Sequence, residues 1–106
     1  MANAIPIRLA AGSGPTFGVD DIACAAATTL GLWREEGLDV TWLPVHGGVQ
    51  AVAALLDGRV DVSYGGLGPA IRARAEGRPV RIVVSMARGL AQNLIVQRRI
   101  VSTDAL

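Results

Sequence analysis

Several residue types that mark common functions are scarce or missing in this chain of 106 residues. It has no lysine, one histidine and one cysteine, so an internal disulfide and a thiolate metal cluster are excluded. The cysteine, Cys24, lies among alanines in a helical stretch, a setting typical of a buried and unreactive thiol. Aromatic residues make up only 4% of the sequence, which argues against a base-stacking surface for nucleic acid.

Charge and long apolar stretches are also lacking. The net charge is +1, so electrostatics gives no reason to expect nucleic acid or an anionic membrane as a partner. No apolar stretch reaches the ~20 residues that a membrane span requires, so no span is expected. Residues 1–5 lack the basic and apolar regions of a signal peptide, and the sequence as written therefore predicts a cytoplasmic location.

What the chain does contain is a regular alternation of segments rich in alanine, valine, leucine and isoleucine, separated by glycines. Gly37, Gly58 and Gly77 each follow a helical stretch and precede a β-rich one, as glycines do at helix C-termini. The pattern predicts strands at residues 5–11, 38–43, 60–64, 80–86 and 93–98 and helices at 19–35, 48–57 and 69–76. Gly31 is expected to weaken the first helix or divide it, and Ser102 or Thr103 resembles the N-cap of a further helix.

The apolar periodicity also predicts which faces are buried. The first two helices are expected to turn these residues inward: Ile22, Ala26, Leu30 and Trp33 in the first, and Val49, Val52, Ala53 and Leu56 in the second. The continuous apolar run at 80–86 is typical of a strand buried on both faces. Strands that alternate with helices predict an α/β fold, a three-layer sandwich around a mainly parallel sheet.

In such sheets ligands bind beyond the carboxyl ends of the strands, so the loops that leave the strands are the candidate site. These loops are rich in glycine, which lets the backbone approach a ligand, and three of them lead into helix N-termini, which favour anions. The predicted ligand-binding residues are Ser13, Thr16, Phe17, His46, Gly47, Gly48, Gly66, Leu67 and Arg88. Phe17 is expected to form an apolar wall and Arg88 to pair with the anion. Each loop taken singly is better explained as an ordinary tight turn, and the case for a site depends on three such loops at one edge.

The residues give no support for catalysis or for a cofactor. Gly12, Gly14 and Gly18 follow the first strand, but their spacing is not that of a dinucleotide fingerprint, and the second strand does not end in an acid. No serine lies in a nucleophile elbow. A single histidine and a single cysteine, without a carboxylate cluster, make a metal site improbable.

An ordered set of motifs resembles a known family. The stretch GLWREEGLDV at residues 31–40 resembles the G-x-F-x-x-E-G-L-D-V motif of the nitrate, sulfonate and taurine binding proteins, a family that also includes the thiamine pyrimidine-precursor binding proteins. Residues 53–62 resemble that family's A-L-x-x-G-x-x-D element, and residues 65–70, 77–83 and 102–106 continue in the same order.

The resemblance implies a type II periplasmic-binding-protein fold, in which two α/β lobes clamp a solute and deliver it to the permease of an ABC importer. Residues 1–106 would then form most of the first lobe. It further implies a small anionic or heterocyclic solute (a sulfonate, nitrate, taurine or a thiamine-pyrimidine-like compound) and a periplasmic location. A partial lobe is expected to expose apolar surface and to be poorly soluble or to self-associate.

Other functions occur on the same fold. One group of cytoplasmic enzymes resembles this chain in architecture and decarboxylates aromatic acids, which keeps a decarboxylase open as the alternative. A synthase of the thiamine pyrimidine is less well matched, because it needs a cysteine-rich motif that this sequence lacks. A sensor domain without a transporter is a third interpretation.

Overall fold

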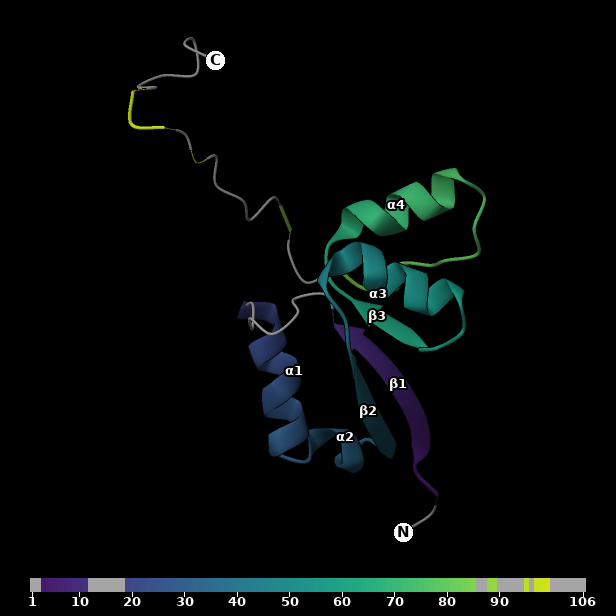
Figure 1. Ribbon diagram of the computed structural model, residues 1–106. Coiled ribbons are helices and arrows are strands. Elements are labelled where there is room, and N and C mark those ends of the chain that lie inside the picture. The colour runs from purple at the N-terminus through teal and green to yellow at the C-terminus, as the bar shows by residue number, and fades with distance from the viewer. Residues whose placement is uncertain (1–2, 12–18, 86–87, 90–94, 96, 100–106) are drawn as a thin grey trace.

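The computed structural model describes residues 3–11, 19–85, 88–89, 95 and 97–99. Within them strands and helices alternate along the chain, as the sequence predicts (Figure 1). The elements are β1 (Ile5–Ala11), α1 (Val19–Thr29), α2 (Leu32–Glu35), β2 (Leu38–Pro44), α3 (Gly47–Leu56), β3 (Val62–Tyr64) and α4 (Leu67–Ala75). The α/β fold class is confirmed.

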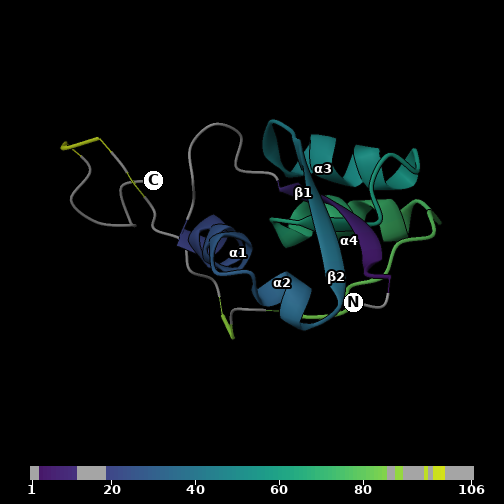
Figure 2. The ribbon, with the colours of Figure 1, turned by 90° about the horizontal axis from the view of Figure 1, so that it is seen from below.

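The described sheet is parallel throughout, with the strand order β2-β1-β3. α3 contacts β1 and β3, while α2 contacts β2. Figure 2 shows α1 and α2 beside β2, on the opposite side from α3 and α4. Because the chain moves from β1 to β2 and then back across β1 to β3, the strand order reverses at β1. Such a switch point is where open α/β sheets bind their ligands.

α3 lies at the centre of the core. On one side its Ala51 and Ala54 pack with Ala10 of β1, and on the other its Val52 packs with Ala73 of α4. Leu55 packs against both clusters. The buried residues at these contacts are alanines and valines, and these small side chains let α3 approach its neighbours closely. The position of α3 against β1 and α4 is therefore well defined.

An ion pair with four hydrogen bonds joins β1 to the start of β3. The Asp61 carboxylate accepts from the Arg8 backbone N–H (2.8 Å), from Arg8 Nε (3.1 Å) and from Arg8 Nη2 (2.8 Å). The Asp61 backbone N–H in turn donates to the Arg8 carbonyl at 2.9 Å. These hydrogen bonds from Arg8 lower the pKa of Asp61 to about 2, the side-chain bonds contributing most. The pair fixes the register in which β3 enters the sheet beside β1.

The first predicted helix is divided where expected, because Gly31 has a left-handed φ of 74° and separates α1 from α2. The predicted inward face is wrong for most of its members. Ile22 and Leu30 are 58% and 67% exposed and Ala26 is exposed, while Trp33 is half-buried. Among the described elements α1 packs chiefly on α2 rather than on the sheet, so its apolar stripe has no strand opposite it.

The inward face of α3 is partly wrong. Val49 is 73% exposed, whereas Val52 is buried as predicted and Leu56 is half-buried. The reason is that α3 packs against two neighbours, the sheet and α4, which cover different sides of the helix. A single-stripe pattern describes a helix with one partner and misses such a two-sided contact.

The strand predicted at 80–86 is not a strand over the part that is described, residues 80–85. Val80 is buried against Val52 and Ala73, but Ile82, Val83 and Val84 are exposed. Burial on both faces is therefore wrong for this run within the described residues. The physical reason is that β3, the last strand of the described sheet on this side, has only three residues. Residues 80–85 therefore have no long strand beside them with which to form backbone hydrogen bonds.

Two further predicted elements cannot be compared in full. The strand at 93–98 falls largely outside the described residues, and 95 and 97–98, which are described, are not in a strand. The expected N-cap at Ser102 or Thr103 lies outside the described residues. β3 begins two residues later than predicted, at Val62, because Asp61 turns its carboxylate to Arg8.

Replacing Asp61 by asparagine should lower the free energy of unfolding at neutral pH, because it removes the charge that Arg8 binds. The pKa of Asp61 is lower in the folded chain than its ordinary value of 3.8, so its stabilisation is present above about pH 4. It is lost as the pH falls through about 2. Urea unfolding of both proteins between pH 2 and pH 7 should show a difference that shrinks toward pH 2.

Asp57→Asn is the matched control, because Asp57 and Arg59 are 3.8 Å apart and both are more than half exposed. It should leave the stability nearly unchanged. If Asp57→Asn lowered the free energy of unfolding as much as Asp61→Asn at every pH, the Arg8–Asp61 pair would have no special role in the fold.

Candidate functional site

The carboxyl ends of the three described strands, at Ala11, Pro44 and Tyr64, lie along one edge of the sheet. The chain that leaves β2 enters α3, and the chain that leaves β3 enters α4. The starts of these two helices are adjacent, since a Cβ atom on Gly48 would lie 3.4 Å from Pro69 Cγ and 3.8 Å from the backbone N and O of Gly66. The second and third predicted loops therefore meet.

The local sequence explains why two helices can begin so close together. Gly47, the first residue of α3, has a φ of 81°, a conformation that residues with a side chain rarely adopt. Gly48 lies at the contact itself, where an added Cβ atom would come to ordinary van der Waals distance from the start of α4. The His46 backbone N–H donates to Oε1 of Gln50 at 2.9 Å, which fixes the entry of the chain into α3.

Neither N-cap residue closes its helix start with its own side chain. His46 at the N-cap of α3 and Gly66 at the N-cap of α4 make no side-chain hydrogen bond to the first turn. The first N–H groups of a helix have no partner within the helix, and they carry the positive end of its dipole. Two such ends side by side suit the negatively charged end of a small molecule.

The structure brings together some of the predicted site residues and does not place the others there. Gly48 and Gly66 are adjacent, and His46, Gly47 and Leu67 lie within two residues of them in the chain, all three exposed. Arg88 is exposed and lies in a bend at 88–89, and its pairing with an anion stays a prediction. Ser13, Thr16 and Phe17 lie outside the described residues.

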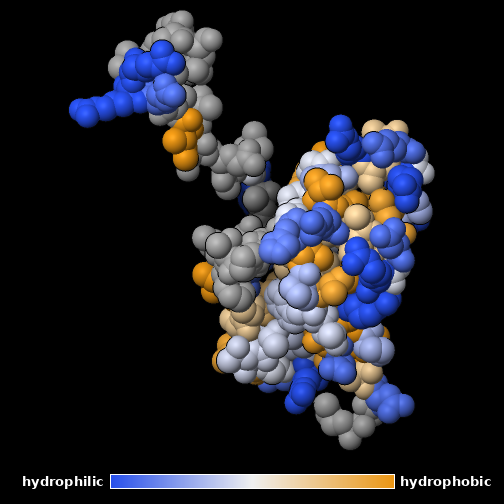
Figure 3. All heavy atoms as spheres, viewed as in Figure 1, coloured by the Kyte–Doolittle hydropathy of each residue, from blue (hydrophilic) through white to orange (hydrophobic). Residues whose placement is uncertain are grey.

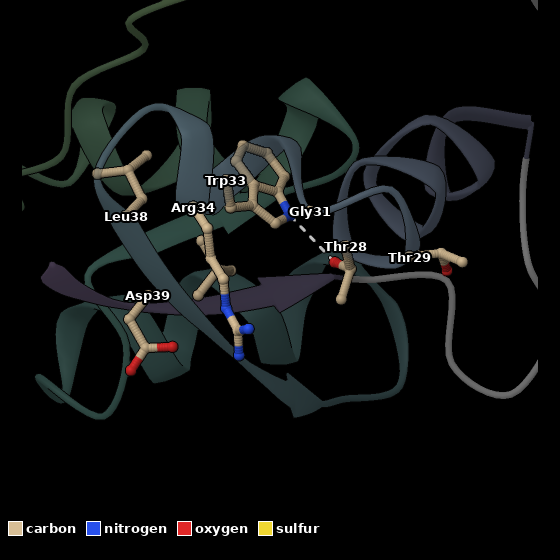
Figure 4. A pocket seen from close by; sticks show the side chains of 8 residues that line it. Thr28, Thr29, Gly31, Trp33, Arg34, Leu38 and Asp39 are labelled. Carbon is tan, nitrogen blue, oxygen red and sulfur yellow. Dashed lines mark hydrogen bonds between the residues drawn. The ribbon is translucent and has the colours of Figure 1, made fainter. Parts of the chain in front are cut away.

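A hollow of about 270 Å³ lies elsewhere, where the α1–α2 corner meets the amino-terminal end of β2 (Figure 4). Its lining residues are Thr28, Thr29, Gly31, Trp33, Arg34, Leu38, Asp39 and Val40. This is the opposite end of β2 from the adjacent helix starts, and six of its lining residues belong to the GLWREEGLDV stretch at residues 31–40. A hollow alone does not identify a ligand site, so the hydrogen bonds of its lining residues have to be considered as well.

The hydrogen bonds around this hollow connect structural elements through one residue, Thr28, and we call this arrangement the Thr28 joint. The Thr28 hydroxyl accepts from Nε1 of Trp33 at 3.0 Å and from Nε1 of Trp42 at 3.2 Å, and it donates to the Cys24 carbonyl at 3.1 Å. A hydroxyl has one donor and two acceptor sites, so these three bonds use its full capacity. These bonds connect α1 to α2 and to β2.

Chemistry-bearing groups are few in the described residues. The pKa of the Cys24 thiol is raised, first by burial and then by the nearby Asp21 charge, which keeps it protonated and weakly nucleophilic. No three His, Cys, Asp or Glu side chains among these residues are grouped to hold a metal ion. In the face seen in Figure 3, hydrophobic and hydrophilic side chains are interspersed over α3 and α4.

No described helix is both long and apolar enough to cross a membrane.

Comparison with known proteins gives one finding. A family model described as NMT1/THI5 like matches residues 20–100. The matched span begins in α1 and includes the α2–β2 stretch, the Asp61 element and both helix starts of the candidate site. Searches against curated proteins and against solved structures gave no match.

Replacing Thr28 by valine should lower the free energy of unfolding by about 1 kcal/mol, because two half-buried indole N–H groups lose their acceptor. Thr29→Val is the control, since the one hydrogen bond of the Thr29 hydroxyl within the described residues goes to the Ala25 carbonyl of its own helix. The control should change the stability by no more than about 0.5 kcal/mol. Urea unfolding followed by tryptophan fluorescence measures the stability of both variants. Equal losses of stability in the two variants would contradict a structural role for the Thr28 hydroxyl.

Proposed function

The chain belongs to the NMT1/THI5-like family, and we propose that it is the solute-binding component of an ABC importer. Membership of this family indicates a solute-binding role in transport or in thiamine-precursor synthesis. The family consists mostly of solute-binding proteins, which favours transport over synthesis. The importer's permease is the partner in this proposal, and the periplasm is the location.

The proposed solute is a small anionic or heterocyclic compound: a sulfonate, nitrate, taurine or a thiamine-pyrimidine-like compound. The observation that carries the proposal is the close approach of Gly48 and Gly66, which sets two uncapped helix starts side by side. Their N–H groups and dipoles complement a negative group without any charged side chain. Leu67, 51% exposed at the first position of α4, offers the apolar contact.

The remaining contacts are proposed from the same edge of the sheet. His46 is the N-cap residue of α3 and is exposed, so its imidazole is available to hydrogen-bond the solute. We assign Ser13, Thr16 and Phe17 to the part of the site that follows β1, and Arg88 to the anion. Residues 1–106 would form part of the first lobe, and a second lobe would close over the solute, as in hinged binding proteins.

The test is a thermal-shift screen of the chain against taurine, alkanesulfonates, nitrate, thiamine pyrimidines and aromatic carboxylates. A compound that binds only the folded state must raise the melting temperature. Isothermal titration of the best compound should then show that Leu67→Ala weakens binding about fivefold, which corresponds to about 1 kcal/mol of lost apolar contact.

Ile71→Ala is the matched control, because Ile71 lies one turn further along α4 and is 53% exposed, close to the 51% of Leu67. It should leave the affinity unchanged. A screen without any shift, or equal effects of the two variants, would contradict the proposal. A shift with an aromatic carboxylate accompanied by release of carbon dioxide would support a decarboxylase instead.

A further inference from the structure

The hollow at the α1–α2 corner is lined by two opposite charges that do not pair with each other. Arg34 and Asp39 both line it and are both exposed. Neither side chain makes a hydrogen bond or an ion pair with any other residue that the structure describes. In the view of Figure 4 the Arg34 guanidinium lies between the Asp39 carboxylate and Thr28. Two opposite charges that line one hollow without meeting can be joined by a molecule that carries the complementary pair.

The remaining wall of this hollow is largely apolar and is held in place. The Trp33 ring, Leu38 and Val40 are half-buried and line it beside the two charges. The Thr28 joint fixes the Trp33 indole through a hydrogen bond of 3.0 Å. A wall that is fixed in advance loses little freedom when a ligand binds. The volume of about 270 Å³ is just below the roughly 300–1,000 Å³ of most ligand pockets, so the hollow suits a small molecule.

We propose that this hollow is a second ligand site, independent of the proposed solute site, and that it binds a free α-amino acid with an apolar side chain. The Arg34 guanidinium holds the carboxylate, to which it can donate two parallel hydrogen bonds. The Asp39 carboxylate accepts from the ammonium group, and the Trp33 ring and Leu38 cover the apolar side chain. A purely apolar ligand or chain segment fits less well, because it would displace water from both charges without pairing them.

An amide NMR titration of the ¹⁵N-labelled chain with leucine tests the ligand. The backbone signal of Gly31 and the indole N–H signal of Trp33 should shift, while the signal of Gly48 should not. N-acetyl-leucine lacks the ammonium group and leucine amide lacks the carboxylate, so each should bind at least tenfold more weakly. Glycine and taurine carry both charges without an apolar side chain, and each should also bind at least tenfold more weakly.

Isothermal titration of variants with leucine tests the residues. Arg34→Gln and Asp39→Asn should each weaken binding at least tenfold. Both should keep the melting temperature of the unmodified chain, because neither side chain has a partner among the described residues. Arg74→Gln and Glu36→Gln are the matched controls, since they remove the same charges from exposed positions that do not line the hollow. The controls should leave the affinity for leucine unchanged.

Four results would each overturn the proposal. The first is the absence of any shift with leucine, and the second is equal binding of leucine and its two blocked forms. The third is an equal loss of affinity in the variants and in their controls. The fourth is a shift of Gly48 in place of Gly31, which would put the amino acid at the strand carboxyl ends.

Discussion

The arrangement of the whole edge that forms the candidate site depends on the Asp61 carboxylate. Asp61 and Arg8 are 53 positions apart in the sequence, and their hydrogen bonds fix β3 in register beside β1. The position of β3 determines where α4 begins, and the small buried residues of α3 determine how closely the two helices approach. A shift of β3 along β1 would separate Gly66 from Gly48 and with them the two helix starts. The final aspartate of the A-L-x-x-G-x-x-D element therefore acts on the site through the fold, without facing it.

Much of the fold could be predicted because its signals are local. Gly37, Gly58 and Gly77 all have positive φ values just after helices, which is the conformation that makes glycine favoured there. The break at Gly31 follows from the same property. The predictions that failed concern contacts between residues that are distant in the sequence. Ile22 and Val49 are apolar residues at helical spacing, yet periodicity cannot tell which neighbour covers a helix or whether any does. The run at 80–85 has the composition of a buried strand, but composition does not supply a paired edge.

The candidate site was predictable to the level of loops and not of contacts. Glycines after successive strands identify the carboxyl edge, because parallel strands end on the same side of a sheet. That Gly48 and Gly66 lie close together could not be inferred, since it depends on the side chains of α3 and on the Arg8–Asp61 pair. The hydrogen bonds of Thr28 could not be predicted from the sequence for a similar reason. One hydroxyl joins Trp33 and Trp42, which belong to different elements, and no sequence pattern marks such a shared acceptor.

In our proposal the starts of α3 and α4 together receive the solute. Its most direct test is an amide NMR titration of the ¹⁵N-labelled chain with taurine, nitrate and a thiamine pyrimidine in turn. We expect one of these compounds to shift the amide signals of Gly47, Gly48, Leu67 and Gly68, while the signal of Gly31, in the hollow at the α1–α2 corner, does not move. Shifts confined to that hollow, or the absence of any shift with all three compounds, would contradict it.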